Sequence, residues 1–380
     1  MWIEKVTKAI EFAKKRKPNV YNWNDTFKKY TVVAFGLRKF FEDTHERLFG
    51  MCNVAYVSDN DEEKWKHVYY GKECIEPEKI KELENPFVIA VVGNYIPLRE
   101  QMRAMNIPIM HIYDMYFSNY EKGENVEWLE KELPNIKKAI ELLADDQSRD
   151  VFTNIFCNKI YGSGTEIDYE TFATSGEYFN TGILTIEDNE VFIDAGAYIG
   201  DTVDDFVKIS NGEFKKIYTL ELSTENYKIL TNNISQYEKQ IHDKIVPINA
   251  GVWNQSGQMG YDHFEAMDGC QIIEGKCENL ARMVSLDEEI PADETVTFIK
   301  MDIEGAEQKA LDGAKRIIST DKPKLAICLY HKPEDLWQIP LMIKDYCSSY
   351  DVYIRHHSTQ NYTDTICYAK CNGGGESCFV

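Results

Sequence analysis

Two glycines and a carboxylate near the middle of the chain have the spacing of a nucleotide-binding turn. Residues 191–202 read VFIDAGAYIGDT, so that an apolar run leads directly into Gly196 and Gly200. At such a turn glycine lets the backbone pass close to a ligand where a side chain would block it, and a following helix points its first amides at that ligand. The next apolar run, residues 216–221, ends in Glu221, at about the distance where Rossmann-like folds place the carboxylate that binds ribose hydroxyls. Together the two features predict an adenosine-containing ligand.

The charge at the turn indicates which adenosine compound binds. The spacing D-x-G-x-x-x-G, which begins at Asp194, differs from the G-x-G-x-x-G of dinucleotide sites. Asp194 would repel a pyrophosphate but attract a cation, and S-adenosylmethionine (SAM) is a cationic ligand. We expect Asp194 to hold the methionine ammonium, directly or through water, and Glu221 to accept both ribose hydroxyls; the alternative for Glu221 is a solvated strand end. The expected cofactor-binding residues are Asp194, Gly196, Tyr198, Gly200, Asp201, Thr202, Glu221 and Asn249.

Asn249 lies near the end of a third apolar run, residues 245–250. Its amide could serve the adenine amino group and a ring nitrogen. Because it stands directly before Ala-Gly, a turn-forming role is an equal alternative.

Three further polar residues, Asp302, Glu304 and His331, follow two later apolar runs and are the expected catalytic residues. The sulfonium of SAM can pass its methyl group to an acceptor by in-line displacement. Such a reaction needs an acceptor oxygen about 3 Å from the methyl group and a base that takes the acceptor's proton. Asp302 and His331 are suitable bases, since an imidazole titrates near neutral pH. The alternative for His331 is a cap on the helix that follows it. The same three side chains could also hold a divalent metal, but the prediction we adopt has no metal.

These residues need a sheet whose strands end at one edge. Seven apolar runs, separated mostly by helical stretches, predict a doubly wound sheet with helices on both faces, whose last two strands form an antiparallel hairpin. Ligands of such a sheet lie beyond the carboxyl ends of its strands. The predicted strands are residues 191–195, 216–221, 245–250, 296–302, 324–330, 351–356 and 365–369.

The pattern of the first 120 residues predicts a separate, smaller Rossmann-like α/β domain. Gly36 closes its first strand but is followed by Leu-Arg-Lys, where a dinucleotide site would need further glycines. We therefore favour an accessory domain over a nucleotide-sugar site with Asp59 on the ligand. The predicted organisation is an accessory domain over residues 1–120, a helical linker and cap over 121–180, the seven-stranded domain over 181–370 and a flexible tail over 371–380.

Residues 150–370 resemble the FkbM-type SAM-dependent methyltransferases. The resemblance rests on separated segments, of which the block DIEGAE at residues 302–307 is the most specific. The others are residues 177–179, 191–202, 220–226, 285–287, 311–314 and 322–331. It implies a class I methyltransferase fold, SAM as cofactor, and methyl transfer to a hydroxyl of a small molecule such as a sugar, a glycan or a secondary metabolite.

Two other functions compete with this interpretation. One is a non-catalytic protein that holds SAM or a nucleotide sugar; retained acceptor-side residues Asp302, Glu304 and His331 favour catalysis over it. The other is a nicotinamide oxidoreductase, which the glycine spacing of both domains disfavours. Segments 161–180 and 258–276 carry no motif that identifies an acceptor.

The composition limits the possible partners. A net charge of −21 opposes binding to a phosphate backbone, so we expect a small-molecule acceptor, with carbohydrates among the candidates, and no nucleic acid. No apolar run is long enough to cross a bilayer and the N-terminus lacks the apolar core of a signal peptide, so we expect a cytoplasmic protein without membrane contact. The ten cysteines have no repeated short spacing, which argues against a disulfide framework or zinc ribbon. A homodimer is compatible with the sequence.

Overall fold

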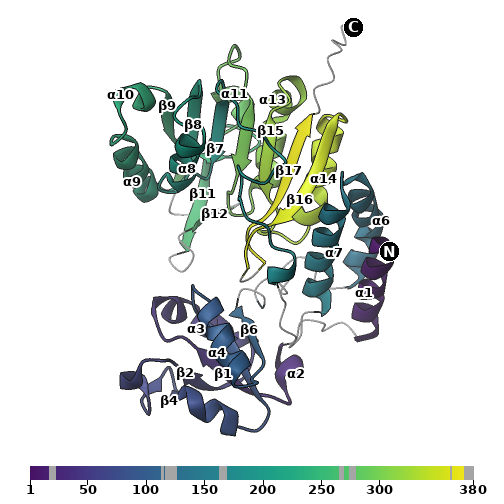
Figure 1. The fold of residues 1–380 in the computed structure, drawn as a ribbon, viewed down its shortest axis with the longest axis vertical. Coiled ribbons are helices and arrows are strands. Elements are labelled where there is room, and N and C mark those ends of the chain that lie inside the picture. The colour runs from purple at the N-terminus through teal and green to yellow at the C-terminus, as the bar shows by residue number, and fades with distance from the viewer. Residues whose placement is uncertain are drawn as a thin grey trace.

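The structure is a computed structural model that describes residues 1–16, 23–112, 115, 126–161, 169–264, 269–273, 280–359 and 362–371. It contains an N-terminal α/β body, a larger C-terminal α/β body, and a group of helices beside the latter (Figure 1). Of the predicted tail only Cys371 is described, and residues 162–168 of the predicted cap also lie outside the described residues. The α/β class predicted from the sequence is confirmed.

Seven strands form the C-terminal sheet in the order β16-β17-β15-β14-β7-β8-β9. They are β7 (Val191–Ala195), β8 (Lys216–Glu221), β9 (Ile245–Asn249), β14 (Phe298–Met301), β15 (Lys324–Cys328), β16 (Tyr350–His356) and β17 (Thr365–Cys371). β17 pairs antiparallel with both neighbours, and the other pairs are parallel. The interior strand β7 is buried at every position, as expected of a parallel strand with helices on both faces. This is the predicted doubly wound sheet with its antiparallel hairpin.

The order of the strands predicts where a ligand binds. The chain runs from β7 outward through β8 to β9 and then returns to the other side of β7 with β14 and β15. The winding therefore reverses between β7 and β14, and a doubly wound sheet binds its ligands beside such a switch point, at the carboxyl ends of the strands. The helices of this domain are α8 (Asp201–Ile209), α9 (Thr224–Ile234), α10 (Lys239–His242), α11 (Leu286–Glu289), α12 (Glu307–Asp312), α13 (Lys315–Thr320) and α14 (Asp335–Tyr346).

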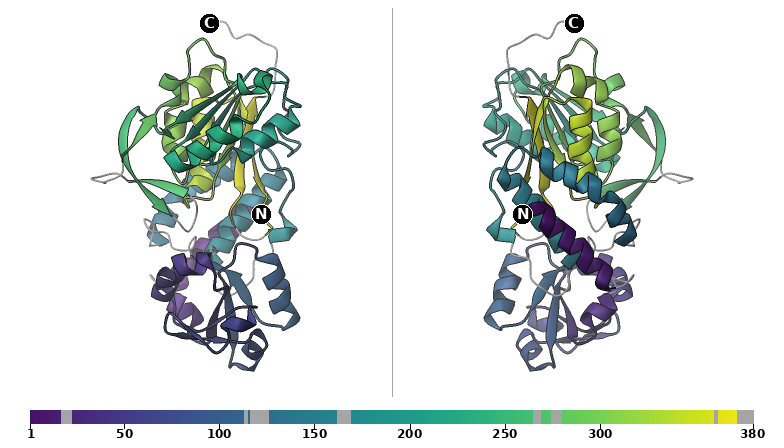
Figure 2. Two further views of the ribbon diagram at one scale, coloured as in Figure 1. Left: turned by 90° about the vertical axis from the view of Figure 1, so that its left-hand side faces the viewer. Right: turned by 90° about the vertical axis from the view of Figure 1, so that its right-hand side faces the viewer.

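A small four-stranded sheet of order β10-β13-β11-β12 leaves the C-terminal body after β9. Its strands are β10 (Gly251–Val252), β11 (Gly257–Phe264), β12 (Gly269–Ile273) and β13 (Leu280–Val284). The antiparallel pair β11 and β12 projects from the domain as an arm (Figure 2). The described residues of segment 258–276, in which the sequence shows no motif, lie in β11 and β12.

The N-terminal body contains a six-stranded sheet of order β3-β4-β2-β1-β5-β6 with its own hydrophobic clusters. Its strands are β1 (Thr31–Phe35), β2 (Val54–Ser58), β3 (Val68–Tyr69), β4 (Lys72–Ile75), β5 (Pro86–Ala90) and β6 (Ile109–His111). Only β3 runs antiparallel to its partner. The helical segments of this body are α2 (Trp23–Phe27), α3 (Lys39–Met51), η1 (Glu62–Lys64), η2 (Pro77–Glu82) and α4 (Ile96–Ala104).

The first helix, α1 (Trp2–Arg16), does not pack on the N-terminal sheet. Its apolar side chains, Val6 and Ile10 among them, belong to the same buried cluster as the C-terminal sheet. It lies with α6 (Val126–Leu142) and α7 (Asp146–Tyr161) beside the C-terminal body (Figure 2). By packing, the accessory body therefore begins at about residue 23, whereas the sequence suggested residues 1–120.

One buried arginine joins the two bodies. Arg99 of α4 is 1% exposed, and its guanidinium lies 2.5 Å from the carboxylate of Glu170, in η3 (Tyr169–Thr171). The same side chain donates a hydrogen bond to the carbonyl of Thr359, at 3.3 Å. None of the described helices is long and apolar enough to pass through a membrane.

Candidate active site

A cavity of about 440 Å³ lies at the carboxyl ends of β7, β8 and β14. Seven of the predicted site residues line it, and four do not. Those that line it are Gly196, Tyr198, Asp201, Thr202, Glu221, Asp302 and Glu304. Asp194, Gly200, Asn249 and His331 are absent from its walls.

Gly196 forms the floor of the turn after β7. Its φ of +80° is in the left-handed region, and a Cβ at this position would lie 1.8 Å from the backbone carbonyl oxygen of Asp302. Because that neighbour is backbone and cannot move aside, position 196 excludes every side chain. The glycine thus lets the ends of β7 and β14 approach each other as well as leaving room for a ligand.

Gly200 has a different role from the predicted contact with a ligand. It is the N-cap of α8 with a φ of +94°, and a Cβ would lie 2.9 Å from the end of the Leu230 side chain. The residues that follow it, Asp201 and Thr202, begin α8 and line the cavity. The predicted helix that begins at the ligand is therefore present, and Gly200 shapes its start.

Asp194 is placed differently from the prediction. Its side chain is fully buried, and its Oδ1 lies 3.0 Å from the ammonium of Lys300 on β14. Burial raises the pKa of Asp194, although the charge of Lys300 opposes that rise. Lys300 also donates a 2.8 Å hydrogen bond to the carbonyl of Gly196. The Asp194 carboxylate therefore holds Lys300 beneath the glycine turn and does not reach a ligand in the cavity.

Glu221 has the geometry expected of a ribose-binding carboxylate. The backbone N–H of Ser223 donates to its Oε1 at 2.7 Å, and the N–H of Tyr198 donates to its Oε2 at 2.9 Å. These bonds fix the carboxylate at the end of β8 and leave lone pairs on both oxygens for two further donors. Burial raises its pKa to about 7, although the two N–H groups favour the charged form.

The amide of Asn249, the predicted adenine contact, is hydrogen-bonded within the protein. Its amide nitrogen donates to the carbonyls of Glu221 and Leu222, at 2.8 and 3.3 Å, and its oxygen accepts a hydrogen bond from Thr224. Asn249 thus ties the loop after β8 to the end of β9. This role resembles the alternative interpretation, in which Asn249 forms a turn. The wall here consists of residues that sequence reasoning missed: Leu222, Asn226, Ala250, Gly251 and Val252.

Asp302 lines the cavity just after the end of β14. The hydroxyl of Tyr330 donates to one of its oxygens at 2.8 Å, and that of Tyr178 donates to the other at 3.1 Å. Burial alone would raise the pKa of Asp302, but the charges of Lys300 and His331 and the two hydroxyls hold it below its ordinary value. Asp302 is therefore a carboxylate at neutral pH.

Sequence reasoning missed several residues beside Asp302. Glu177 and Tyr178, from the segment before β7, line the cavity with Lys300. Desolvation and the charge of Asp364 raise the pKa of Glu177 to about 7, although part of its side chain stays exposed. The available signal was the segment Glu177-Tyr-Phe, which belonged to the family resemblance but had no assigned role.

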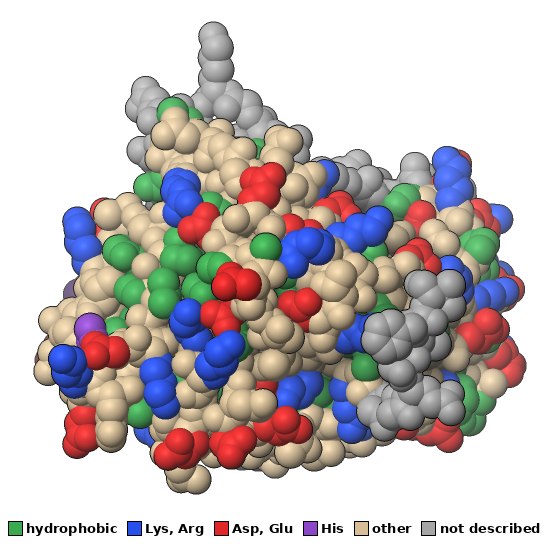
Figure 3. Space-filling view, turned by 90° about the horizontal axis from the view of Figure 1, so that it is seen from above, with side chains coloured by type: hydrophobic (Ala, Val, Ile, Leu, Met, Phe, Trp, Pro, Cys, Tyr) green, Lys and Arg blue, Asp and Glu red, His purple; other side chains and the backbone are tan. Residues whose placement is uncertain are grey.

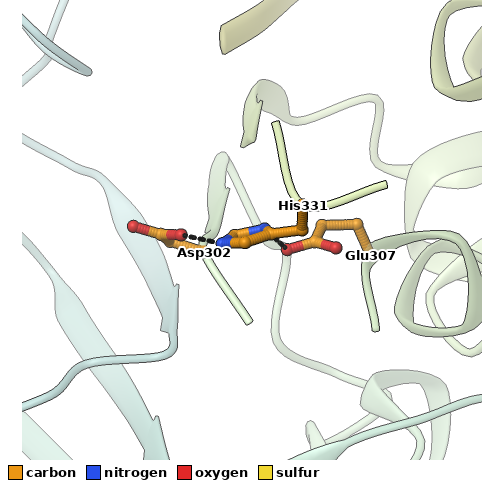
Figure 4. A group of neighbouring side chains, drawn as sticks. All are labelled: Asp302, Glu307 and His331. Atoms are coloured by element: carbon orange, nitrogen blue, oxygen red, sulfur yellow. Dashed lines mark hydrogen bonds and ion pairs between the residues drawn. The ribbon is translucent and has the colours of Figure 1, made fainter. Parts of the chain in front are cut away.

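His331 lies behind the cavity wall in a cluster of carboxylates. Its Nδ1 is 2.8 Å from Glu307, while its Nε2 is 3.4 Å from Asp302 and 3.6 Å from Glu304 (Figure 4 shows all but Glu304). Burial opposes the charged imidazole, but these carboxylates raise its pKa to about 10. At neutral pH His331 therefore already carries its proton. Its predicted role as a base that titrates near pH 6–7 does not fit this environment.

The fold and the site together define the class of the protein. The sheet order, the reversed strand β17 and the cavity beside the glycine turn are those of a class I methyltransferase domain. Residues 194–364 match the model of the methyltransferase FkbM domain. A search among curated proteins gives no significant match.

Solved structures agree with the fold. The chain is similar over 97% of its length to the whole methyltransferase FkbM from Methylobacillus flagellatus KT, with 21% identity and a TM-score of 0.73. More remote matches include a putative rRNA methylase from Clostridium thermocellum, with 10% identity over 54% of this chain and 92% of the other and a TM-score of 0.33. Another is a putative methyltransferase from Streptococcus mutans in complex with SAH, with 13% identity over 49% of this chain and 90% of the other and a TM-score of 0.32. These two carry no further inference.

The cavity has the chemistry that SAM requires. Six carboxylates and a single lysine are among its described lining residues, which favours a cationic ligand over a phosphorylated one. Glu221 can accept the ribose diol, and the first turn of α8 supplies backbone amides. Since Asp194 is paired with Lys300, the carboxylates available to the methionine ammonium include Asp201 and Asp205.

Proposed function

We propose that this protein transfers the methyl group of SAM to a hydroxyl of a small molecule, with carbohydrates among the candidate acceptors. The observation that carries the proposal is that one cavity of an FkbM methyltransferase domain contains both the buried carboxylate Glu221 and the charged, hydrogen-bonded carboxylate Asp302. Glu221 suits a ribose diol. Asp302 suits the proton of an incoming hydroxyl.

The reaction needs little covalent chemistry from the protein. The acceptor oxygen attacks the methyl carbon in line, the carbon–sulfur bond breaks, and its electron pair remains on sulfur. The hydroxyl proton must leave during this step. Asp302 lies at the end of β14 and accepts two tyrosine hydroxyls, so it is held in one orientation towards the cavity. Its main contribution is then to orient the acceptor and to receive its proton.

The acidic character of the protein supports a small acceptor. The net charge is −21, and acidic and basic side chains of the described residues are interspersed on the face seen in Figure 3. A nucleic-acid substrate would require a concentrated positive surface.

The N-terminal body supports an accessory role. The backbone N–H groups of Leu37 and Asp61 donate hydrogen bonds to the carboxylate of Asp59, at 2.7 and 3.0 Å. The ammonium of Lys64 donates to the same carboxylate at 3.1 Å. A Cβ on Gly36 would lie 2.6 Å from the Val91 carbonyl oxygen, so packing within the sheet accounts for this glycine. We therefore expect no nucleotide at this turn.

Calorimetry with SAM and the full chain is the first test. We expect Glu221→Gln to weaken SAM binding by about 1.5–3 kcal/mol, the scale of hydrogen bonds to a charged group. Glu213→Gln, which changes an exposed carboxylate outside the cavity, is the matched control and should bind SAM as the wild type does. Equal affinity in the wild type and Glu221→Gln would overturn the assignment of the ribose site.

Methyl transfer itself is tested with methyl-labelled SAM and a panel of hydroxyl compounds, beginning with sugars. Release of S-adenosylhomocysteine with label in an ether product would support the proposal. The rival, a protein that only holds SAM, predicts binding without transfer to any acceptor of the panel. Label found on nitrogen or carbon would overturn the hydroxyl assignment while leaving the methyltransferase class intact.

A further inference from the structure

The cluster around His331 has features that the proposed reaction does not use. Ligand atoms of Asp302, Glu307 and His331 lie within 4.8 Å of one another, the one such group of three among the described residues, and Glu304 lies 3.6 Å from Nε2 of the same histidine. The imidazole is 8% exposed and Glu307 is fully buried. Asp302 and Glu304 also line the cavity. A cation held here would stand between the buried cluster and a bound acceptor.

The two nitrogens of His331 have different surroundings. Nδ1 is 2.8 Å from Glu307 (Figure 4). The Glu307 carboxylate also accepts a hydrogen bond from the backbone N–H of Ile303, at 3.0 Å. Nε2 is buried and has no hydrogen-bond partner, although the carboxylates of Asp302 and Glu304 face it. A histidine that donates one ring N–H to a carboxylate presents the other nitrogen as an oriented lone pair, which is the usual arrangement of a metal ligand.

The distances from Nε2 to the two carboxylates fit two ligands of one cation better than they fit hydrogen bonds. Nε2 lies 3.4 Å from Asp302 and 3.6 Å from Glu304. Hydrogen bonds between nitrogen and oxygen are about 2.7–3.2 Å long. Two ligands that each lie about 2.1 Å from one cation are about 3.0 Å apart at a right angle and about 3.4 Å apart at a tetrahedral angle.

We propose that Asp302, Glu304 and Nε2 of His331 bind a divalent cation of the Mg²⁺ or Mn²⁺ type at the wall of the cavity. Two carboxylates and one imidazole are a donor set suited to such ions. Glu307 is the positioning residue, because it fixes the ring through Nδ1. Three protein ligands leave further coordination positions open, and two of these ligands, Asp302 and Glu304, line the cavity.

The backbone supports this arrangement. Glu304 has a φ of +54°, a left-handed conformation that is uncommon for residues other than glycine, and Gly305 follows with +91°. This turn brings the Glu304 carboxylate back towards His331, which an extended or helical continuation of β14 would not do. Such strain is typical of functional sites, where the surroundings enforce it.

The role of the cation rests on the proposed methyl transfer. An acceptor hydroxyl that binds the cation becomes more acidic and gives its proton to Asp302 more readily, the resulting oxygen forms the bond to the methyl carbon, and the carbon–sulfur electron pair stays on sulfur. Binding of the cation displaces the proton from Nε2 of His331, and the freed lone pair is the ligand.

Electron paramagnetic resonance of free Mn²⁺, titrated against the full chain without SAM, tests the site directly. After purification through a chelator, the wild type should bind one Mn²⁺ per chain, and MgCl₂ should compete. Glu304→Gln should lose at least tenfold in Mn²⁺ affinity, and so should His331→Gln. Glu307→Gln, which removes only the orienting contact, should lose about 10- to 100-fold. The surface control Glu213→Gln should bind as the wild type does.

The decisive variant is Glu304→Gln, because its side chain is 38% exposed and the change is tolerable to the fold. Wild-type Mn²⁺ affinity in Glu304→Gln, or no binding to the wild type at millimolar Mn²⁺, overturns the site. SAM calorimetry on the same preparations separates the two proposals. If the protein binds SAM but not Mn²⁺, the cation site is refuted and the methyltransferase assignment stands. If it binds Mn²⁺ but not SAM, the cation site stands and the methyltransferase assignment is refuted.

Discussion

Glu221 makes the stability of the protein depend on pH in a way that a single substitution can isolate. Its pKa is raised by burial from the ordinary value of 4.5 to about 7. At about 1.4 kcal/mol per pH unit, this makes the charged carboxylate about 3 kcal/mol less favourable in the folded protein than in the unfolded chain. The folded state holds the proton more tightly, so this contribution destabilises the fold increasingly as pH rises from about 4.5 to about 7 and is constant above that range.

Glu221→Gln removes the titration. The difference in unfolding free energy between wild type and variant should therefore shift by up to about 3 kcal/mol in favour of the variant between pH 5 and pH 8. Because the glutamine amide can satisfy only one of the two N–H donors of Tyr198 and Ser223, a constant cost of about 1–3 kcal/mol accompanies the change at every pH. The shift with pH is thus the diagnostic quantity.

This shift with pH can be measured by urea unfolding at half-unit pH steps. The wild type, Glu221→Gln and Glu213→Gln are compared in parallel. Other buried acids titrate in the same range, but they are common to all three proteins and cancel in the difference. A difference that stays constant between pH 5 and pH 8 would refute the argument, since it would mean that Glu221 titrates as it does in water. Repeating the series with SAM should remove most of the shift, because ribose hydroxyls favour the charged carboxylate.

Three further outcomes follow from the contacts. Gly196→Ala should destabilise the fold by more than about 3 kcal/mol because its Cβ meets backbone, whereas Gly200→Ala should cost about 1–2 kcal/mol for its left-handed conformation; thermal unfolding compares them. Asp302→Asn should lower turnover about 10²- to 10⁴-fold with little change in SAM affinity, as kinetics and calorimetry would show. Arg99→Ala should lower the unfolding free energy by about 1–2 kcal/mol and speed proteolysis between the two bodies, since it removes the contact with Glu170.

The sequence was sufficient for the sheet and for its ligand-binding edge. Apolar runs that are buried on both faces are long, regular signals, and the seven predicted runs correspond to the seven strands of the C-terminal sheet. The turn after β7 was predicted from its glycine spacing, and the carboxylate that ends β8 from its distance along the chain. Both lie at the cavity because the carboxyl ends of neighbouring parallel strands share one edge.

The partners of individual side chains could not be predicted in the same way. Asp194 and Asn249 both lie near the carboxyl ends of strands, but each is engaged by the protein itself, Asp194 by Lys300 and Asn249 by the backbone after β8. Position along a strand fixes which edge a residue is near, not which neighbour it meets. The helix α1 was misplaced for a similar reason, since its apolar stripe shows that it packs but not on which body.

The block at residues 302–307 shows why its sequence is specific. Asp302 ends β14, Glu304 and Gly305 turn the chain through left-handed conformations, and Glu307 begins α12 with its carboxylate on the N–H of Ile303. Each spacing places an acid near the imidazole of His331, which lies three residues beyond the end of the neighbouring strand β15. Three carboxylates in so small and buried a volume repel one another unless a positive charge stands among them. The proton on His331 supplies one such charge, and a divalent cation with Nε2 as ligand would supply a larger one, turned towards the substrate.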